Sequence, residues 1–273
     1  MRVFVFLASL LSVAAISRPP AQVDPGLLQH LRPVQQRDTT RALAHQSRGL
    51  TLVSESKFEA ALDQFRRSTA YDPTLAPTYI NMAYCLDRLG RFEEAIAELK
   101  AAEKLDPTNV MIFINWGNSL LNLKRYQDAL EPLNKAAELD SANVLARLNL
   151  AAVYSNLNRP KDAITELEKA ADAAPKNPQI FFNWAMLLSN TGDVGAALEK
   201  YQRVIELDPK NLSAYYNRAA LFEKTGQLDK AIAVLQEAIK VLPDNATLKE
   251  ILQKLETVQR QQPMQLPPPT LNR

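Results

Sequence analysis

The chain has 273 residues, of which 47% are hydrophobic and 23% charged, and its formal net charge is +2. The charge argues against a nucleic-acid binder, because residues 42–260 carry 26 basic against 28 acidic side chains and no basic stripe. The chain has two histidines and one cysteine, with no glycine-rich phosphate loop and no nucleophile motif, so it does not supply the groups that a metal site or a Cys-His dyad needs. We therefore expect a protein that is not an enzyme, with no catalytic residue, no metal and no cofactor.

Residues 1–17 have the layout of a secretory signal peptide. Arg2 precedes an apolar run from Val3 to Ile16, and small residues such as Ala14 and Ser17 suit cleavage. The run is shorter than the roughly 20 apolar residues that a spanning helix needs. We expect export to the periplasm or the cell exterior, with no membrane span after cleavage. The alternatives are an uncleaved segment that tethers the protein to the membrane and a misassigned start codon.

Residues 18–41 contain four prolines and are predicted to form a linker, interrupted at most by a short helical turn through Leu27, Leu28 and Leu31. At the other end, residues 246–260 carry apolar side chains on one face and charges on the other, which predicts a closing helix. Residues 261–273 are rich in proline, and we expect them to form a disordered tail.

Between these ends, the same residue types recur every 34 residues. Proline does so at Pro73, Pro107, Pro175, Pro209 and Pro243, with Ser141 at the one place where a proline is missing. Asparagine does so at Asn81, Asn115, Asn149, Asn183 and Asn217. The period divides the chain into six units, 42–75, 76–109, 110–143, 144–177, 178–211 and 212–245.

Each unit has the pattern of a helical hairpin. In the second unit, apolar residues follow in steps of three and four at Tyr79, Met82, Ala83 and Leu86, then at Phe92, Ala95, Ile96 and Leu99. Gly90 lies between the two halves, and Gly192 and Gly226 repeat it in later units. We expect these glycines to adopt the left-handed conformation that ends one helix and starts the next.

These residues resemble the tetratricopeptide repeat, a 34-residue helix-turn-helix unit with large, small and proline residues at fixed offsets. The third unit supplies Phe113, Trp116, Gly117, Leu120, Ala129 and Leu133. Small residues recur in every second helix, at Ala61, Ala95, Ala129, Ala163, Ala197 and Ala231. The resemblance implies an all-α fold, a right-handed α-solenoid of six helix-turn-helix repeats closed by a C-terminal capping helix.

A few residues depart from the repeat pattern. His45 and Arg147 replace the first large residue of their units, and we expect both to be tolerated. Pro160 and Pro178 fall at helix starts, where the missing N–H costs nothing. Pro132 is predicted to interrupt and bend the second helix of the third unit, because it removes a hydrogen bond and crowds the preceding turn.

The candidate binding site follows from the resemblance, which implies that the first helix of each unit lines a concave groove. The five asparagines at the 34-residue period lie on these helices, and a second row follows seven residues later at Asn122, Asn156 and Asn190. An asparagine amide can pair with both the C=O and the N–H of an extended peptide. The alternative is a structural role, in which the asparagines join adjacent hairpins. Tyr84, Met111, Asn118, Met186 and Tyr216 are the neighbours expected to supply apolar pockets.

The carboxylate clamp of chaperone-binding tetratricopeptide domains is disfavoured, because its basic residues are missing here: Gln46, Leu50 and Met111 occupy three of the places. We therefore predict a non-catalytic interaction scaffold that binds an extended, uncharged peptide or partner protein segment in the concave groove. The alternative is an envelope or periplasmic assembly factor that joins a complex through its convex face or its ends.

Overall fold

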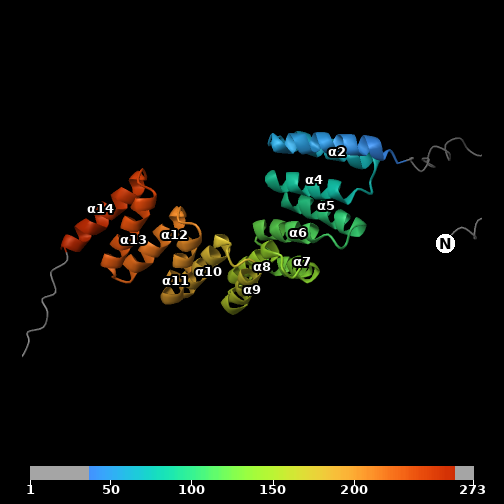
Figure 1. Cartoon of the computed structure of the whole chain (residues 1–273). Helices are drawn as coiled ribbons and strands as arrows, with labels where there is room; N and C mark the ends of the chain where they lie inside the picture. Colours follow the sequence, from blue (N-terminus) through green and yellow to red (C-terminus); the bar gives the residue numbers. More distant parts are fainter. Residues whose placement is uncertain (1–36, 262–273) are drawn as a thin grey trace, which may run out of the picture.

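The computed structural model describes residues 37–261 (Figure 1). The signal peptide expected at 1–17, most of the expected linker and the expected tail lie outside the described residues. Within 37–261 the chain forms thirteen helices and no strand, which confirms the all-α class. The hairpins are α2 (Thr39–Ser54) with α3 (Phe58–Tyr71), α4 (Ala76–Arg88) with α5 (Phe92–Leu105), α6 (Val110–Asn122) with α7 (Tyr126–Leu139), α8 (Val144–Asn156) with α9 (Pro160–Ala173), α10 (Pro178–Thr191) with α11 (Val194–Leu207), and α12 (Leu212–Lys224) with α13 (Leu228–Val241), followed by α14 (Ala246–Gln261).

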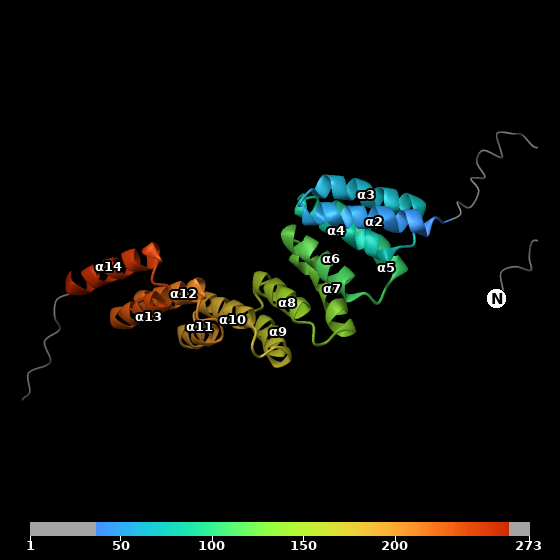
Figure 2. The ribbon, with the colours of Figure 1, turned by 45° about the horizontal axis from the view of Figure 1, so that its top comes forward.

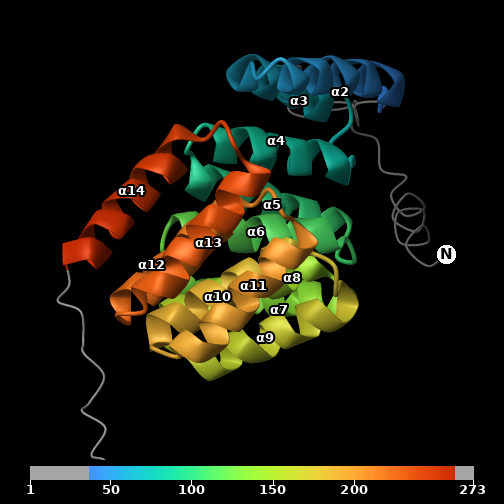
Figure 3. The ribbon, with the colours of Figure 1, turned by 60° about the vertical axis from the view of Figure 1, so that its left-hand side comes forward.

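The hairpins stack in chain order along an arc. Each first helix contacts the first helix of the next hairpin along most of the array. In Figure 1, α6, α8 and α10 lie on the inner side of the arc, and α7, α9 and α11 lie on its outer side. Figure 2 shows α2 and α14 at opposite ends of the array. In Figure 3 the helices α12, α13 and α14 cross the direction of α4 and α6, so the stack also twists along its length.

The turn inside every hairpin places one residue in the left-handed region. The expected glycines do so, with φ of 75° at Gly90, 87° at Gly192 and 73° at Gly226. The remaining hairpins put a residue with a side chain at the same place of the 34-residue period. These residues are Ser56, Lys124 and Asn158, with φ of 59°, 58° and 57°. The conformation therefore belongs to the hairpin, and glycine only lowers its cost.

A second set of asparagines, also 34 residues apart, caps four first helices and α14. The side-chain oxygen of each accepts a hydrogen bond from a backbone N–H in the first turn, at Asn109, Asn143, Asn177, Asn211 and Asn245. The cap satisfies one of the N–H groups that a helix leaves unpaired at its start. At α2, Asp38 has this role, so the first helix begins at Thr39, inside the range expected to be linker.

The core lies between the two helices of each hairpin and between successive hairpins. The alanine expected in every second helix is fully buried in all six repeats. Space beside the first helices is equally tight, since a Cβ added to Gly117 would lie 2.4 Å from the side chain of Leu133. One apolar cluster runs from the first repeat into the fourth and a second from the fifth into α14. A smaller cluster around Leu167 and Ile180 joins them.

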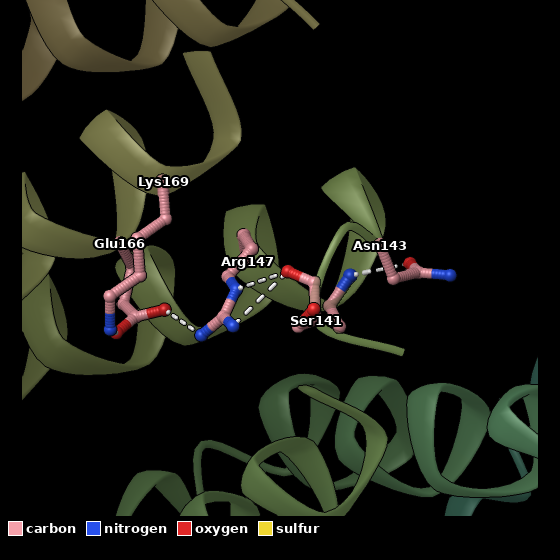
Figure 4. A network of polar contacts seen from close by, with 6 residues as sticks. Ser141, Asn143, Arg147, Glu166 and Lys169 are labelled. Carbon is pink, nitrogen blue, oxygen red and sulfur yellow. Dashed lines mark hydrogen bonds and ion pairs between the residues drawn. The ribbon is translucent and has the colours of Figure 1, made fainter. Parts of the chain in front are cut away.

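Two expectations about unusual residues change with the structure. Pro132 does not interrupt its helix, because α7 continues through it from Tyr126 to Leu139 and is as long as α9. Arg147 was expected only to be tolerated, but its guanidinium interacts with a carboxylate and with a backbone oxygen (Figure 4). Its Nη1 lies 2.7 Å from Oε2 of Glu166 on α9, and its Nε and Nη2 donate to the backbone oxygen of Ser141.

Candidate functional site

The first row of asparagines lies on the inner helices, as expected. Asn81, Asn115, Asn149, Asn183 and Asn217 occupy equivalent places on α4, α6, α8, α10 and α12, and all five are half-buried. The second row lies at or next to the last residue of α6, α8 and α10. Its members, Asn122, Asn156 and Asn190, are exposed.

The side-chain amides of four predicted residues already bind within the protein. Asn149 Nδ2 donates to Asn118 Oδ1 across α8 and α6 at 2.7 Å, which joins adjacent repeats. Asn156 and Asn217 donate to backbone oxygens four residues earlier in their own helices, and Asn183 Oδ1 accepts from Gln179. Asn149 therefore has the structural role of joining adjacent hairpins.

The other four amides stay available. Among residues 37–261, the side-chain amides of Asn81, Asn115, Asn122 and Asn190 have no hydrogen-bond partner. Asn183 also keeps its two amide donors, because only its oxygen is used. The inner face thus combines amides that stabilise the stack with amides that could bind a ligand.

Three of the predicted residues come together in one hollow between α8 and α10. Asn156, Asn183 and Asn190 line a space of about 240 Å³ together with Met186, and Leu167 of α9 is also in its lining. None of the lining residues is charged. The other five predicted residues lie along the row outside this hollow.

The residue that opens the hollow was not foreseen. Ala152 lies on α8 at the place that Tyr84, Asn118 and Met186 occupy on other first helices, and it lines the hollow. Its short side chain leaves space between the neighbouring amides. Ala220 repeats the small residue at this place on α12, where it lines another hollow, so the short residues in this row were the signal in the sequence.

Exposed apolar side chains accompany the amides along the inner helices. Tyr84, Met111 and Met186 are 41%, 45% and 45% exposed, as expected for residues that supply apolar contacts. Tyr216 differs, because it is half-buried and its hydroxyl is buried. It lines another hollow, formed between α12, α13 and α14. Large exposed apolar residues in a row favour an interaction surface.

The described structure also bears on the cysteine, on metal binding and on membrane spans. Burial raises the pKa of the Cys85 thiol to about 11, so this core residue stays neutral at physiological pH. Within 37–261, no three His, Cys, Asp or Glu side chains are grouped to hold a metal ion. In the same part of the chain, no helix combines the length and the apolar character needed to cross a bilayer.

Comparisons with known proteins agree with this architecture. The tetratricopeptide repeat profile matches residues 52–110, 120–181 and 191–255. The solved structure of YrrB, described as a TPR protein with an unusual peptide-binding site, is 27% identical with a TM-score of 0.52 and covers 70% of this chain and 97% of its own. A comparison with curated proteins gave no match.

Two further solved structures share the fold at lower identity. PilF of Pseudomonas aeruginosa is 20% identical with a TM-score of 0.62, covering 79% of this chain and 98% of its own. A tetratricopeptide repeat protein of Parabacteroides merdae is 16% identical with a TM-score of 0.63, covering 81% and 88%. Because the family profile matches more than half of the chain, over the same helices that form the hairpins, the protein belongs to the tetratricopeptide repeat family.

Proposed function

We propose that this protein is a non-catalytic scaffold that binds an extended, uncharged segment of a partner protein along its inner face. The observation that carries the proposal is the hollow between α8 and α10, where three asparagines and exposed Met186 meet without any charged residue. A peptide backbone would pair with the amides, and one apolar side chain would enter the hollow.

The expected affinity of the groove for a peptide is modest. A hydrogen bond contributes about 0.5–1.5 kcal/mol net, so a few amides supply a few kcal/mol before the cost of ordering the peptide. The apolar anchor must therefore add to them. The similarity to YrrB, whose description names a peptide-binding site, supports a peptide as ligand.

Photo-crosslinking of the partner protein in cells tests binding in the groove directly. A photo-crosslinking residue in place of Met186 is expected to trap the partner, and Asn183→Ala with Asn190→Ala is expected to reduce that adduct about 10-fold, the loss of one to two hydrogen bonds. The matched control removes two amides from outer helices, Gln127→Ala with Gln236→Ala, and should leave the adduct unchanged.

Two results would overturn the groove. One is an adduct at Met186 that survives the loss of both asparagines in a variant with unchanged circular dichroism. The other is recovery of the same partner from a crosslinker at Gln127 with equal yield, which would favour the alternative, an assembly factor that binds through its outer face.

We further propose that the protein is exported and that residues 1–17 are removed. The charged start, the apolar run and the small residues before Arg18 support this. Cell fractionation with N-terminal sequencing of the purified protein should find it outside the cytoplasm, beginning near residue 18. A membrane-bound protein that still begins at Met1 would indicate a tether instead.

A further inference from the structure

A second pocket opens on the outer side of the array, in the third repeat. It has a volume of about 460 Å³ and lies between α5 and α7, with Phe113 and Trp116 of α6 in its lining. Pro132 and Glu131 of α7 line one side, and Glu103 of α5 lines the other. It shares no residue with the hollow between α8 and α10.

The fifth repeat shows what fills this space when it is closed. Phe181 and Trp184 repeat the aromatic pair of the third unit two periods later. There, the ammonium of Lys200 lies over the Trp184 ring, 3.7 Å from its centroid. Pro132 stands at the place of Lys200, and its ring cannot reach over Trp116. The pocket therefore lies beside Trp116 on the side where the fifth repeat places a lysine side chain.

The charges at the rim also suit a cation. The charged residues in the lining are three glutamates and Lys135. Lys135 lies 3.9 Å from Glu138, whereas Glu103 and Glu131 form no ion pair with any residue between 37 and 261. The nearest ammonium to the aromatic floor is that of Lys100, at 5.1 Å from the Trp116 centroid, farther than Lys200 lies from Trp184. Two carboxylates beside an indole attract an ammonium by ion pairing and by cation–π interaction.

We propose that this pocket binds a lysine side chain of a partner protein, held over Trp116 and between Glu103 and Glu131. Such a contact would give the array a second, outer binding site that selects a basic residue, whereas the inner face selects an uncharged segment. The pocket shares helix α6 with the inner face but no residue with the hollow between α8 and α10, so the two can be tested separately.

The two tryptophans allow a test by NMR on the full chain. The probe is the capped peptide Ala-Ala-Lys-Ala-Ala, and its control has norleucine, which keeps the alkyl chain without the charge. We expect the Trp116 indole resonance to shift saturably with the lysine peptide only, while the Trp184 resonance stays in place. Glu103→Gln with Glu131→Gln should weaken binding about three-fold or more, as expected for the loss of exposed ion pairs.

A pair of variants at Pro132 sharpens the test. Pro132→Lys supplies the ammonium from the protein itself and should abolish peptide binding, whereas Pro132→Ala leaves the pocket open and should bind as the parent does. Both remove a helix-interior proline, so neither is expected to unfold α7. Equal shifts with the norleucine peptide, equal shifts of both indoles, or full binding by Pro132→Lys would each overturn the proposal. So would a Trp116 shift produced by raising the protein concentration alone, which would assign the pocket to a second copy of the chain.

Discussion

Arg147 and Tyr79 occupy equivalent places two repeats apart, and each donates a hydrogen bond to the backbone carbonyl six residues before it. The Tyr79 hydroxyl reaches the oxygen of Pro73 at 3.1 Å, and the Arg147 guanidinium reaches that of Ser141 at 3.2 and 3.3 Å. Arginine adds a charge that Glu166 neutralises, and the two side chains are only 12% and 10% exposed. The departure from the repeat pattern is thus compensated within its own hairpin.

Loss of Glu166 should therefore be costly. We expect Glu166→Ala to lower the free energy of unfolding by about 2–4 kcal/mol, because it leaves the Arg147 charge unpaired in a mostly buried place. Combining it with Arg147→Tyr should recover most of that loss, since the second repeat has a tyrosine, Tyr79, at the equivalent place. Urea unfolding of both variants measures this. A double variant no more stable than Glu166→Ala would contradict the explanation.

The close approach at Gly117 gives a second prediction. A Cβ there would lie 2.4 Å from Leu133, so Gly117→Ala should destabilise the protein by about 1–3 kcal/mol through overpacking. Gly195 of α11 is the matched control, because the only neighbour of its added Cβ is Asp193 Oδ1 at 3.9 Å. Gly195→Ala should stabilise by up to about 1 kcal/mol through helix propensity. Thermal melting of the two variants should shift in opposite directions.

The left-handed turns give a third prediction, with opposite signs at equivalent places. Lys124 has φ of 58° and Gly90 has φ of 75°. Lys124→Gly should stabilise by about 1 kcal/mol, and Gly90→Lys should destabilise by a similar amount, because only glycine adopts this region without steric cost. Asn158→Gly should have a smaller effect, since asparagine tolerates the conformation. Melting temperatures that rank Asn158→Gly above Lys124→Gly would argue against this reason.

Cys85 makes stability depend on alkaline pH. Burial raises its pKa from 9.0 to about 11, so its contribution is complete below pH 9, where the thiol is neutral in both states. Between pH 9 and 11 the unfolded chain releases the proton while the folded chain keeps it, and stability should fall. Urea unfolding at pH 8 and pH 10.5 should show a smaller alkaline loss in Cys85→Ala than in the parent. Equal losses would show that the thiol does not titrate on unfolding.

The asparagine row should divide into structural and available members. We expect Asn149→Ala to cost about 1 kcal/mol of stability, because it removes the hydrogen bond to Asn118 between repeats. Asn115→Ala should be close to neutral, since its amide has no partner in the described part of the chain. Urea unfolding compares the two, and equal losses would mean that the main row is uniformly structural.

Much of the fold could be predicted from the period alone. Each hairpin contacts only its neighbours, so the local pattern of apolar residues is enough to define helices, turns and their order. The glycines at 90, 192 and 226 and the prolines at 160 and 178 behaved as their backbone chemistry requires. Pro132 did not interrupt α7, because neighbouring turns and packing hold a helix through a single missing hydrogen bond.

By itself, the sequence determined the class, the number of repeats, the hairpin turns and the rows of side chains on the inner helices. Only the tertiary structure decided which side chains meet: Arg147 with Glu166, Asn149 with Asn118, the hollow beside Ala152 and the pocket beside Pro132. These relationships join residues of different helices, and they depend on side-chain sizes and charges that the 34-residue period does not specify. A period fixes where each residue lies along its helix, whereas the close packing between helices decides what it contacts.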